Sequence, residues 1–284
     1  MANVNFVTFA DKNFTLQKKH LINLAKVSGN FNNVYGLGFK DLEKSFVSKY
    51  SKILRNEKGA GFWIWKFQVI KQVLSNLEKD SLLVYSDAGS TFNLGGQKRF
   101  DEYIEMLLDS PFATLRFQNS NIEKFWTSKE VFQYFNLNVE SNEGNSEQYL
   151  AGHLILKNNY QTLDQLNEFE KVLDYDVNLI TDKYSKDQIS GFKQSRHDQS
   201  IFSLISKIHG CVELGNEVWF KNNLTEQYNY PFLALQQGNY SFWQKIKFYA
   251  QFKKNINRQI FFGDPVYFYQ KPSMISRFKH KFKK

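Results

Sequence analysis

The stretch FQVIKQVLSNLEKDSLLVYSDAGS, residues 67–90, joins an amphipathic helix pattern to a short apolar run. Its first half carries apolar residues at the spacing of one buried helix face, namely Val69, Ile70, Val73, Leu74 and Leu77. The run at 82–85 is typical of a buried strand, and small and polar residues follow it directly. A helix leading into a buried strand is a repeating unit of α/β sheets, so this stretch predicts that class of fold.

Further units of the same kind precede this stretch. Residues 3–10 and 31–38 are predicted strands, and residues 11–29 between them are a predicted helix that ends at Gly29. Residues 41–54 form another helical pattern. Strands that alternate with helices of this length favour a mostly parallel central sheet with helices on both faces. Ligands of such sheets bind at the carboxyl ends of the strands.

Asp87 lies at such a strand end. A turn alone would explain Asp87 and Gly89, because both residue types suit the backbone angles that end a strand. The alternative is that the carboxylate of Asp87 holds a metal ion bound to phosphate, because hard divalent cations prefer carboxylate and phosphate oxygens. The local pattern leaves both interpretations open.

Composition narrows the class of protein. The chain has 284 residues, of which 42% are hydrophobic, enough to bury one large core or two modest ones. No apolar run approaches the roughly 20 residues that span a bilayer, and residues 1–14 lack a signal-peptide pattern, so we expect a cytoplasmic protein. The single cysteine, Cys211, excludes an internal disulfide and zinc sites built on cysteine pairs.

Basic residues are concentrated near the end of the chain. Residues 240–284 contain eleven Lys or Arg and one acidic residue, Asp264, whereas the whole chain carries a net charge of +9. We therefore predict a folded domain over 1–239 and a basic, aromatic-rich helical extension over 240–284 that binds an anionic membrane surface. The alternatives are a solvated tail beyond a core helix, or a segment that contacts nucleic acid through phosphates and base stacking.

Four segments together resemble one family. Residues 59–90 (GAGFWIWKFQVIKQVLSNLEKDSLLVYSDAGS), 125–132 (FWTSKEVF), 147–158 (EQYLAGHLILKN) and 195–210 (SRHDQSIFSLISKIHG) occur in its order. They look like nucleotide-sugar-dependent glycosyltransferases of the GT-A fold, which act in surface polysaccharide and lipopolysaccharide synthesis. The resemblance covers roughly residues 1–215 and implies one Rossmann-like α/β domain with helices on both faces of its sheet.

The resemblance also implies a donor site at the ends of two strands. Its predicted residues are Thr8, Phe9 and Ala10 at the end of the first strand, Lys66 just before the helix pattern that starts at residue 67, and Asp87, Ala88 and Gly89 after the strand at 82–85. Asp87 would hold Mn²⁺ or Mg²⁺ against the diphosphate, and Lys66 would contact the diphosphate as a point charge. GT-A enzymes usually carry Asp-x-Asp here, and Gly89 replaces the second Asp, which puts the requirement for metal in doubt. Phe67 stands where the family commonly has Pro.

Asp198 is the predicted catalytic carboxylate. It begins a helix whose apolar residues recur at buried-face spacing, so it would also serve as a helix cap without any function. As a catalyst it would accept a proton from the acceptor hydroxyl in an inverting reaction. In a retaining reaction it would attack or stabilise the sugar ring. The sequence leaves the stereochemistry open.

Acceptor or sugar contacts are predicted in two segments of the chain, residues 151–153 and the residues next to Asp198. The residues concerned are Ala151, Gly152, His153, Arg196, His197 and Gln199. Ala151 and Gly152 are small enough to let a ligand approach the start of a strand. The alternative for His153 is a structural role, which a lone histidine beside an apolar run has more often than a role in acceptor binding. The polar stretch 138–148 is predicted to be a mobile loop.

Two functions of different classes follow. The first is a hexosyl- or pentosyltransferase that moves a sugar from a nucleotide-sugar donor to a glycan or lipid-linked acceptor, as a peripheral protein on the inner face of the membrane. The second is a non-catalytic protein that binds nucleic acid through residues 240–284. Residues 1–239 are close to neutral overall, and a nucleic-acid groove would normally recruit basic residues from that part as well. The sequence therefore favours the transferase.

Overall fold

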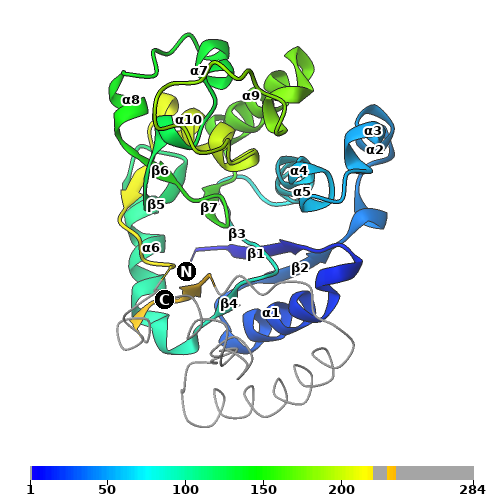
Figure 1. Ribbon diagram of the computed structural model, residues 1–284. Helices are drawn as coiled ribbons and strands as arrows, with labels where there is room; N and C mark the ends of the chain where they lie inside the picture. Colours follow the sequence, from blue (N-terminus) through cyan, green and yellow to red (C-terminus); the bar gives the residue numbers. More distant parts are fainter. Residues whose placement is uncertain (1, 220–228, 235–284) are drawn as a thin grey trace, which may run out of the picture.

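The computed structural model describes residues 2–219 and 229–234 (Figure 1). The predicted extension at 240–284, and with it the predicted boundary after residue 239, lies outside the described residues. The strands are β1 (Val4–Phe9), β2 (Asn33–Leu37), β3 (Leu82–Ser86), β4 (Thr91–Phe92), β5 (Thr114–Ile122), β6 (Glu147–Tyr149), β7 (His153–Lys157), β8 (Val212–Leu214) and β9 (Phe232–Leu233).

The helices separate these strands along the chain. They are α1 (Thr15–Ser28), α2 (Lys44–Lys49), α3 (Ser51–Leu54), α4 (Gly59–Phe62), α5 (Trp65–Leu74), α6 (Gln97–Asp109), α7 (Lys129–Tyr134), α8 (Asn142–Asn145), α9 (Tyr160–Tyr175) and α10 (Asp198–His209). The predicted helix at 11–29 is confirmed, and Gly29 ends it with a left-handed backbone at φ 73°. The stretch 138–148, predicted to be a mobile loop, instead contains α8 and the start of β6, because Ser141 caps α8.

The central sheet has the strand order β2-β1-β3-β7-β5-β6, with β8 beside β5. Strand β1 runs parallel to β2 and β3, as predicted, and β8 runs parallel to β5. Strand β7 is antiparallel to both β3 and β5, and β6 is antiparallel to β5. The sheet is therefore mixed rather than mostly parallel. A strand buried on both faces is apolar throughout, so its sequence does not reveal the direction of its neighbour.

Helices cover both faces of the sheet, as predicted (Figure 1). Alternate residues of the strands point to opposite faces, so Phe6 and Val84 pack with α1 and α6. Val7 and Leu83 pack on the other face with α5, α9 and α10. The helices α5 and α10 pack on the same face, and Lys66 near the start of α5 lies 2.6 Å from Asp198 at the start of α10.

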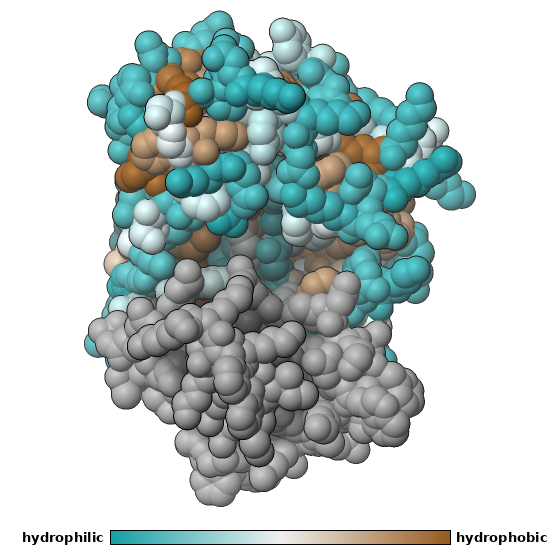
Figure 2. All heavy atoms as spheres, viewed as in Figure 1, coloured by the Kyte–Doolittle hydropathy of each residue, from teal (hydrophilic) through white to brown (hydrophobic). Residues whose placement is uncertain are grey.

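The described residues present a mainly polar surface on the one face drawn in Figure 2. On the face drawn in Figure 2, hydrophilic residues cover most of this surface and apolar residues appear in small groups between them. None of the helices in the described ranges is long and apolar enough to cross a membrane.

Candidate active site

A cleft of about 480 Å³ opens at the carboxyl ends of β1 and β3. It is lined by five of the predicted donor-site residues, namely Phe9, Ala10, Asp87, Ala88 and Gly89. Thr8 is buried and Lys66 lies below the surface, so neither lines the cleft. The lining also includes residues that sequence reasoning did not assign to the site, among them Asp11, Phe14, Glu57, Trp63 and Trp65.

One wall of the cleft is a left-handed turn at residues 59–63, which includes the short element α4. All five residues have positive φ angles, between 50° and 99°. Gly59 and Gly61 tolerate this conformation, whereas Ala60, Phe62 and Trp63 are strained in it. The turn leads directly into α5, where Trp65 stacks on Phe9 at 4.0 Å between ring centroids. It thereby brings Lys66, the second residue of α5, under the strand ends.

Replacing Ala60 by glycine is expected to stabilise the protein. A non-glycine residue in the left-handed region costs about 1–2 kcal/mol, and the extra freedom of glycine in the unfolded chain cancels part of this gain. We expect the free energy of unfolding, measured by urea denaturation, to rise by about 0.5–1 kcal/mol. The control is Ala25→Gly in α1, where glycine should destabilise by about 1 kcal/mol. A loss of stability in Ala60→Gly would show that the turn is not strained at this residue.

The ammonium group of Lys66 joins the two predicted carboxylates. Its Nζ lies 2.6 Å from Oδ2 of Asp198 and 3.2 Å from Oδ1 of Asp87, and it donates a hydrogen bond of 3.0 Å to the carbonyl oxygen of Ala151. The exposed fractions of the side chains are 2% for Lys66, 6% for Asp198 and 36% for Asp87. We call these three side chains the charged trio. Asp87 belongs to the cleft surface, and the other two lie beneath it.

Burial and charge set the protonation of the trio. Burial raises the pKa of Asp198 to about 6, although the positive charge of Lys66 opposes the shift. Burial alone would lower the pKa of Lys66, but the charges of Asp198 and Asp87 outweigh it and raise that pKa. Lys66 therefore stays protonated near neutral pH, and Asp198 changes charge within the range in which enzymes usually work.

Two neighbours fix the position of Asp87. The hydroxyl group of Tyr85 donates a hydrogen bond of 2.6 Å to Oδ1 of Asp87, and the backbone N–H of Asp87 donates to the carbonyl oxygen of Gly152. A Cβ atom on Gly152 would lie 3.2 Å from Oδ2 of Asp87, which is closer than Cβ atoms usually pack. Gly152 thus provides room for the carboxylate, and Tyr85 orients it.

His153, a predicted sugar contact, lies inside the protein. Its Nδ1 is 2.7 Å from Oγ of Ser86 and its Nε2 is 3.2 Å from Oγ of Ser90, while burial lowers the pKa of the ring to about 4. Both ring nitrogens therefore have hydrogen-bond partners, and the neutral ring links Ser86 and Ser90, which lie on either side of Asp87 in the sequence. The structure places His153 as a support of this turn, away from the lining of the cleft.

The side chains of Arg196 and His197, which precede Asp198 in the sequence, contact other side chains of the protein. The guanidinium carbon of Arg196 lies 4.3 Å from the ring centroid of Trp126. The Nε2 of His197 lies 3.0 Å from Oδ1 of Asp182, and its ring centroid is 5.4 Å from that of Trp63. His197 adjoins the left-handed turn and has a positive φ of 56° itself.

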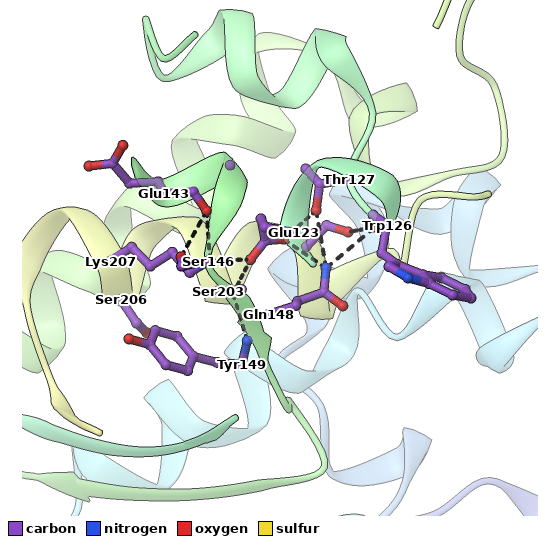
Figure 3. A network of polar contacts seen from close by, with 12 residues as sticks. Glu123, Trp126, Thr127, Glu143, Ser146, Gln148, Tyr149, Ser203, Ser206 and Lys207 are labelled. Carbon is purple, nitrogen blue, oxygen red and sulfur yellow. Dashed lines mark hydrogen bonds and ion pairs between the residues drawn. The ribbon is translucent and has the colours of Figure 1, made fainter. Parts of the chain in front are cut away.

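Gln199 and Ala151 contact each other rather than the cleft. The backbone N–H of Ala151 donates to Oε1 of Gln199, and Nε2 of Gln199 donates to Oε1 of Gln148 at 2.6 Å. Gln148 in turn donates at 2.7 Å to the buried carboxylate of Glu123, which the sequence analysis did not identify. Figure 3 shows Glu123 among Gln148 of β6, Ser203 and Lys207 of α10, and Thr127.

One solved structure shares this architecture. The chain is similar to a glycosyltransferase involved in the glycosylation of the major capsid of PBCV-1, with 10% identity over 89% of this chain and 99% of that chain and a TM-score of 0.51. It also matches the apo structure of the bifunctional glycosyltransferase WbbM, with 14% identity over 90% of this chain and 50% of that chain and a TM-score of 0.45. No protein-family model and no curated protein matches the sequence. The fold is that of GT-A glycosyltransferases, as the resemblance of the sequence implied.

Proposed function

We propose that the protein is a glycosyltransferase that moves a sugar from a nucleotide-sugar donor to a glycan or lipid-linked glycan, in surface polysaccharide synthesis. The observation that carries this proposal is the charged trio at the floor of the cleft. Asp87 and Asp198 are far apart in sequence, yet both lie within 3.2 Å of the Nζ of Lys66. Carboxylates brought together under a cleft at the strand ends of a GT-A fold suit the transfer of a sugar.

The donor diphosphate needs a positive partner in this cleft. The charged residues that line it are Asp11, Glu57 and Asp87, and no lysine or arginine occurs among the described residues of the lining. A divalent cation, Mn²⁺ or Mg²⁺, fits this charge pattern, because such ions bind one or two carboxylates together with phosphate oxygens. Asp87 would hold it. When bound, the ion would neutralise the charge of the departing diphosphate.

Asp198 supplies the base in this proposal, and its carboxylate, 6% exposed, comes within reach of the acceptor hydroxyl once the substrates are bound. A carboxylate with a pKa of about 6 is largely ionised at neutral pH and still basic enough to accept a proton from an acceptor hydroxyl. Lys66 keeps this carboxylate in place and Tyr85 orients Asp87. The aromatic residues Phe14 and Trp63 offer flat apolar surfaces for the nucleotide or sugar.

A lipid-linked acceptor would explain the basic residues at 240–284, because each Lys or Arg near an anionic membrane contributes about 1 kcal/mol of attraction. This part of the proposal rests on the sequence alone. The near-neutral charge of residues 1–239 disfavours the alternative function, since a nucleic-acid groove normally recruits basic residues from the folded part of the chain as well.

The proposal predicts that metal and nucleotide bind together. We expect UDP, GDP or ADP with Mn²⁺ to raise the melting temperature by about 5–10 °C at a hundredfold excess over Kd, because such binding contributes about 2.7 kcal/mol. Mn²⁺ alone or the nucleotide with EDTA should shift it far less. Asp87→Asn should remove the gain, whereas Asp109→Asn on the exposed end of α6 should keep it. If no nucleotide stabilises the protein, or Asp87→Asn responds like the wild type, the donor site is assigned wrongly.

A further inference from the structure

Glu123 is a buried carboxylate outside the cleft. It begins the short helix η4 (Glu123–Phe125), and its side chain has no exposed area. Its Oε2 lies 3.0 Å from Nζ of Lys207, which is also nearly buried. A buried ion pair adds little net stability, because the cost of removing both charges from water offsets their attraction. Stability alone therefore does not explain why a charged pair occupies this position.

The contacts of Glu123 connect three elements (Figure 3). On α10, Glu123 accepts a hydrogen bond from Ser203 and pairs with Lys207, one helical turn further on. On β6, it accepts from Gln148 at 2.7 Å, and just after η4 it accepts from Thr127 at 2.5 Å. These contacts fix α10 along its axis relative to β6.

Two routes lead from Glu123 to the charged trio. The first runs along α10, because Asp198 is the first residue of the helix that Ser203 and Lys207 anchor. The second runs through Gln148 and Gln199 to the backbone N–H of Ala151, whose carbonyl oxygen holds Lys66. One buried group thus supports both partners of the Lys66–Asp198 ion pair.

We propose that Glu123 is a positioning residue that sets the distance between the carboxylate of Asp198 and the ammonium group of Lys66. This inference rests on the proposed function for its effect on turnover, but its effect on the ion pair is independent of it. If Glu123 no longer anchors α10, Asp198 and Lys66 separate. The positive charge of Lys66 then counteracts the effect of burial less, so the pKa of Asp198 rises and the carboxylate is protonated at a higher pH.

The test compares Glu123→Gln with Glu217→Gln. Glu217 accepts hydrogen bonds from Arg99 and Tyr103 of α6, which packs on the sheet face opposite to α5 and α10, so its replacement costs stability without touching the site. For Glu123→Gln we expect kcat to fall about 10- to 100-fold with the donor KM within about twofold, because small displacements of reacting groups have effects of this size. The acidic limb of the kcat profile should move to higher pH. Glu217→Gln should change neither.

A second readout separates this inference from the proposed function. The pKa of Asp198, followed by carboxyl NMR and assigned with Asp198→Asn, should rise in Glu123→Gln even if the wild type transfers no sugar from any donor tested. If Glu123→Gln does not fold, Gln148→Met, which breaks the second route and leaves Glu123 paired with Lys207, should also raise the pKa of Asp198, by less than Glu123→Gln would. An unchanged pKa of Asp198 together with an unchanged kcat would overturn the inference, whatever the loss of stability.

Discussion

Asp198→Asn is expected to lower kcat about 10²- to 10⁴-fold, the range that general acid–base groups contribute. Asparagine has nearly the same shape as aspartate but cannot accept the proton of the acceptor hydroxyl. Because Asp198 is buried beneath Asp87 and does not line the cleft, the Kd of the donor should stay within about twofold. Steady-state transfer and calorimetric titration of the donor measure the two effects separately.

The control for this experiment is Asp187→Asn. Asp187 is exposed and pairs with Lys129 on the surface, so its replacement should leave both kcat and Kd unchanged. The wild-type kcat should also fall as the pH drops through about 6, because Asp198 is then protonated. An Asp198→Asn protein that transfers sugar at the wild-type rate would remove Asp198 from the reaction.

Lys66→Met is expected to have the largest effect on stability, about 3–5 kcal/mol at pH 8, because it leaves a buried carboxylate without its counter-ion. The sign of the pH dependence follows from Asp198. Its pKa in the folded protein, about 6, lies above the ordinary value of 3.8. Protonation of Asp198 therefore stabilises the folded state fully below pH 3.8, and this stabilisation is lost as the pH rises through 6. Without Lys66 the folded pKa rises further and the loss continues to higher pH.

The cost of Lys66→Met should therefore be larger at pH 8 than at pH 5, as measured by urea unfolding. Lys71→Met provides the matched control, because Lys71 pairs with Glu170 in a partly exposed contact that contributes at most about 1 kcal/mol. Its cost should be similar at both pH values. Equal stability of Lys66→Met and the wild type at pH 8 would mean that Lys66 does not neutralise Asp198.

Much of the N-terminal half of the fold could be predicted from the sequence. Apolar periodicity located α1, α5 and the buried strands β1 and β3, and the polar residues after β3 placed Asp87 at a strand end. Periodicity is a local property, however, and it does not report which strands pair. The antiparallel direction of β7 was missed for this reason.

The site was predictable only in part. Spacing along the chain cannot show that Asp198 lies close to Asp87, because the two residues belong to elements that meet only in the folded protein. The sequence did not indicate that Trp63 and Trp65 line the cleft. Their position depends on the left-handed turn, and positive φ angles at Phe62 and Trp63 have no sequence signal. Glu123 lies in a polar stretch that is typical of a surface, so nothing local indicates its burial.

The most direct test of the central claim is a crystal structure of the protein grown with a nucleoside diphosphate and Mn²⁺. The account predicts an anomalous manganese peak beside the carboxylate of Asp87, with the diphosphate in the cleft at the ends of β1 and β3 and the Lys66–Asp198 pair beneath it. A nucleotide or manganese ion bound elsewhere, with this cleft empty, would contradict it.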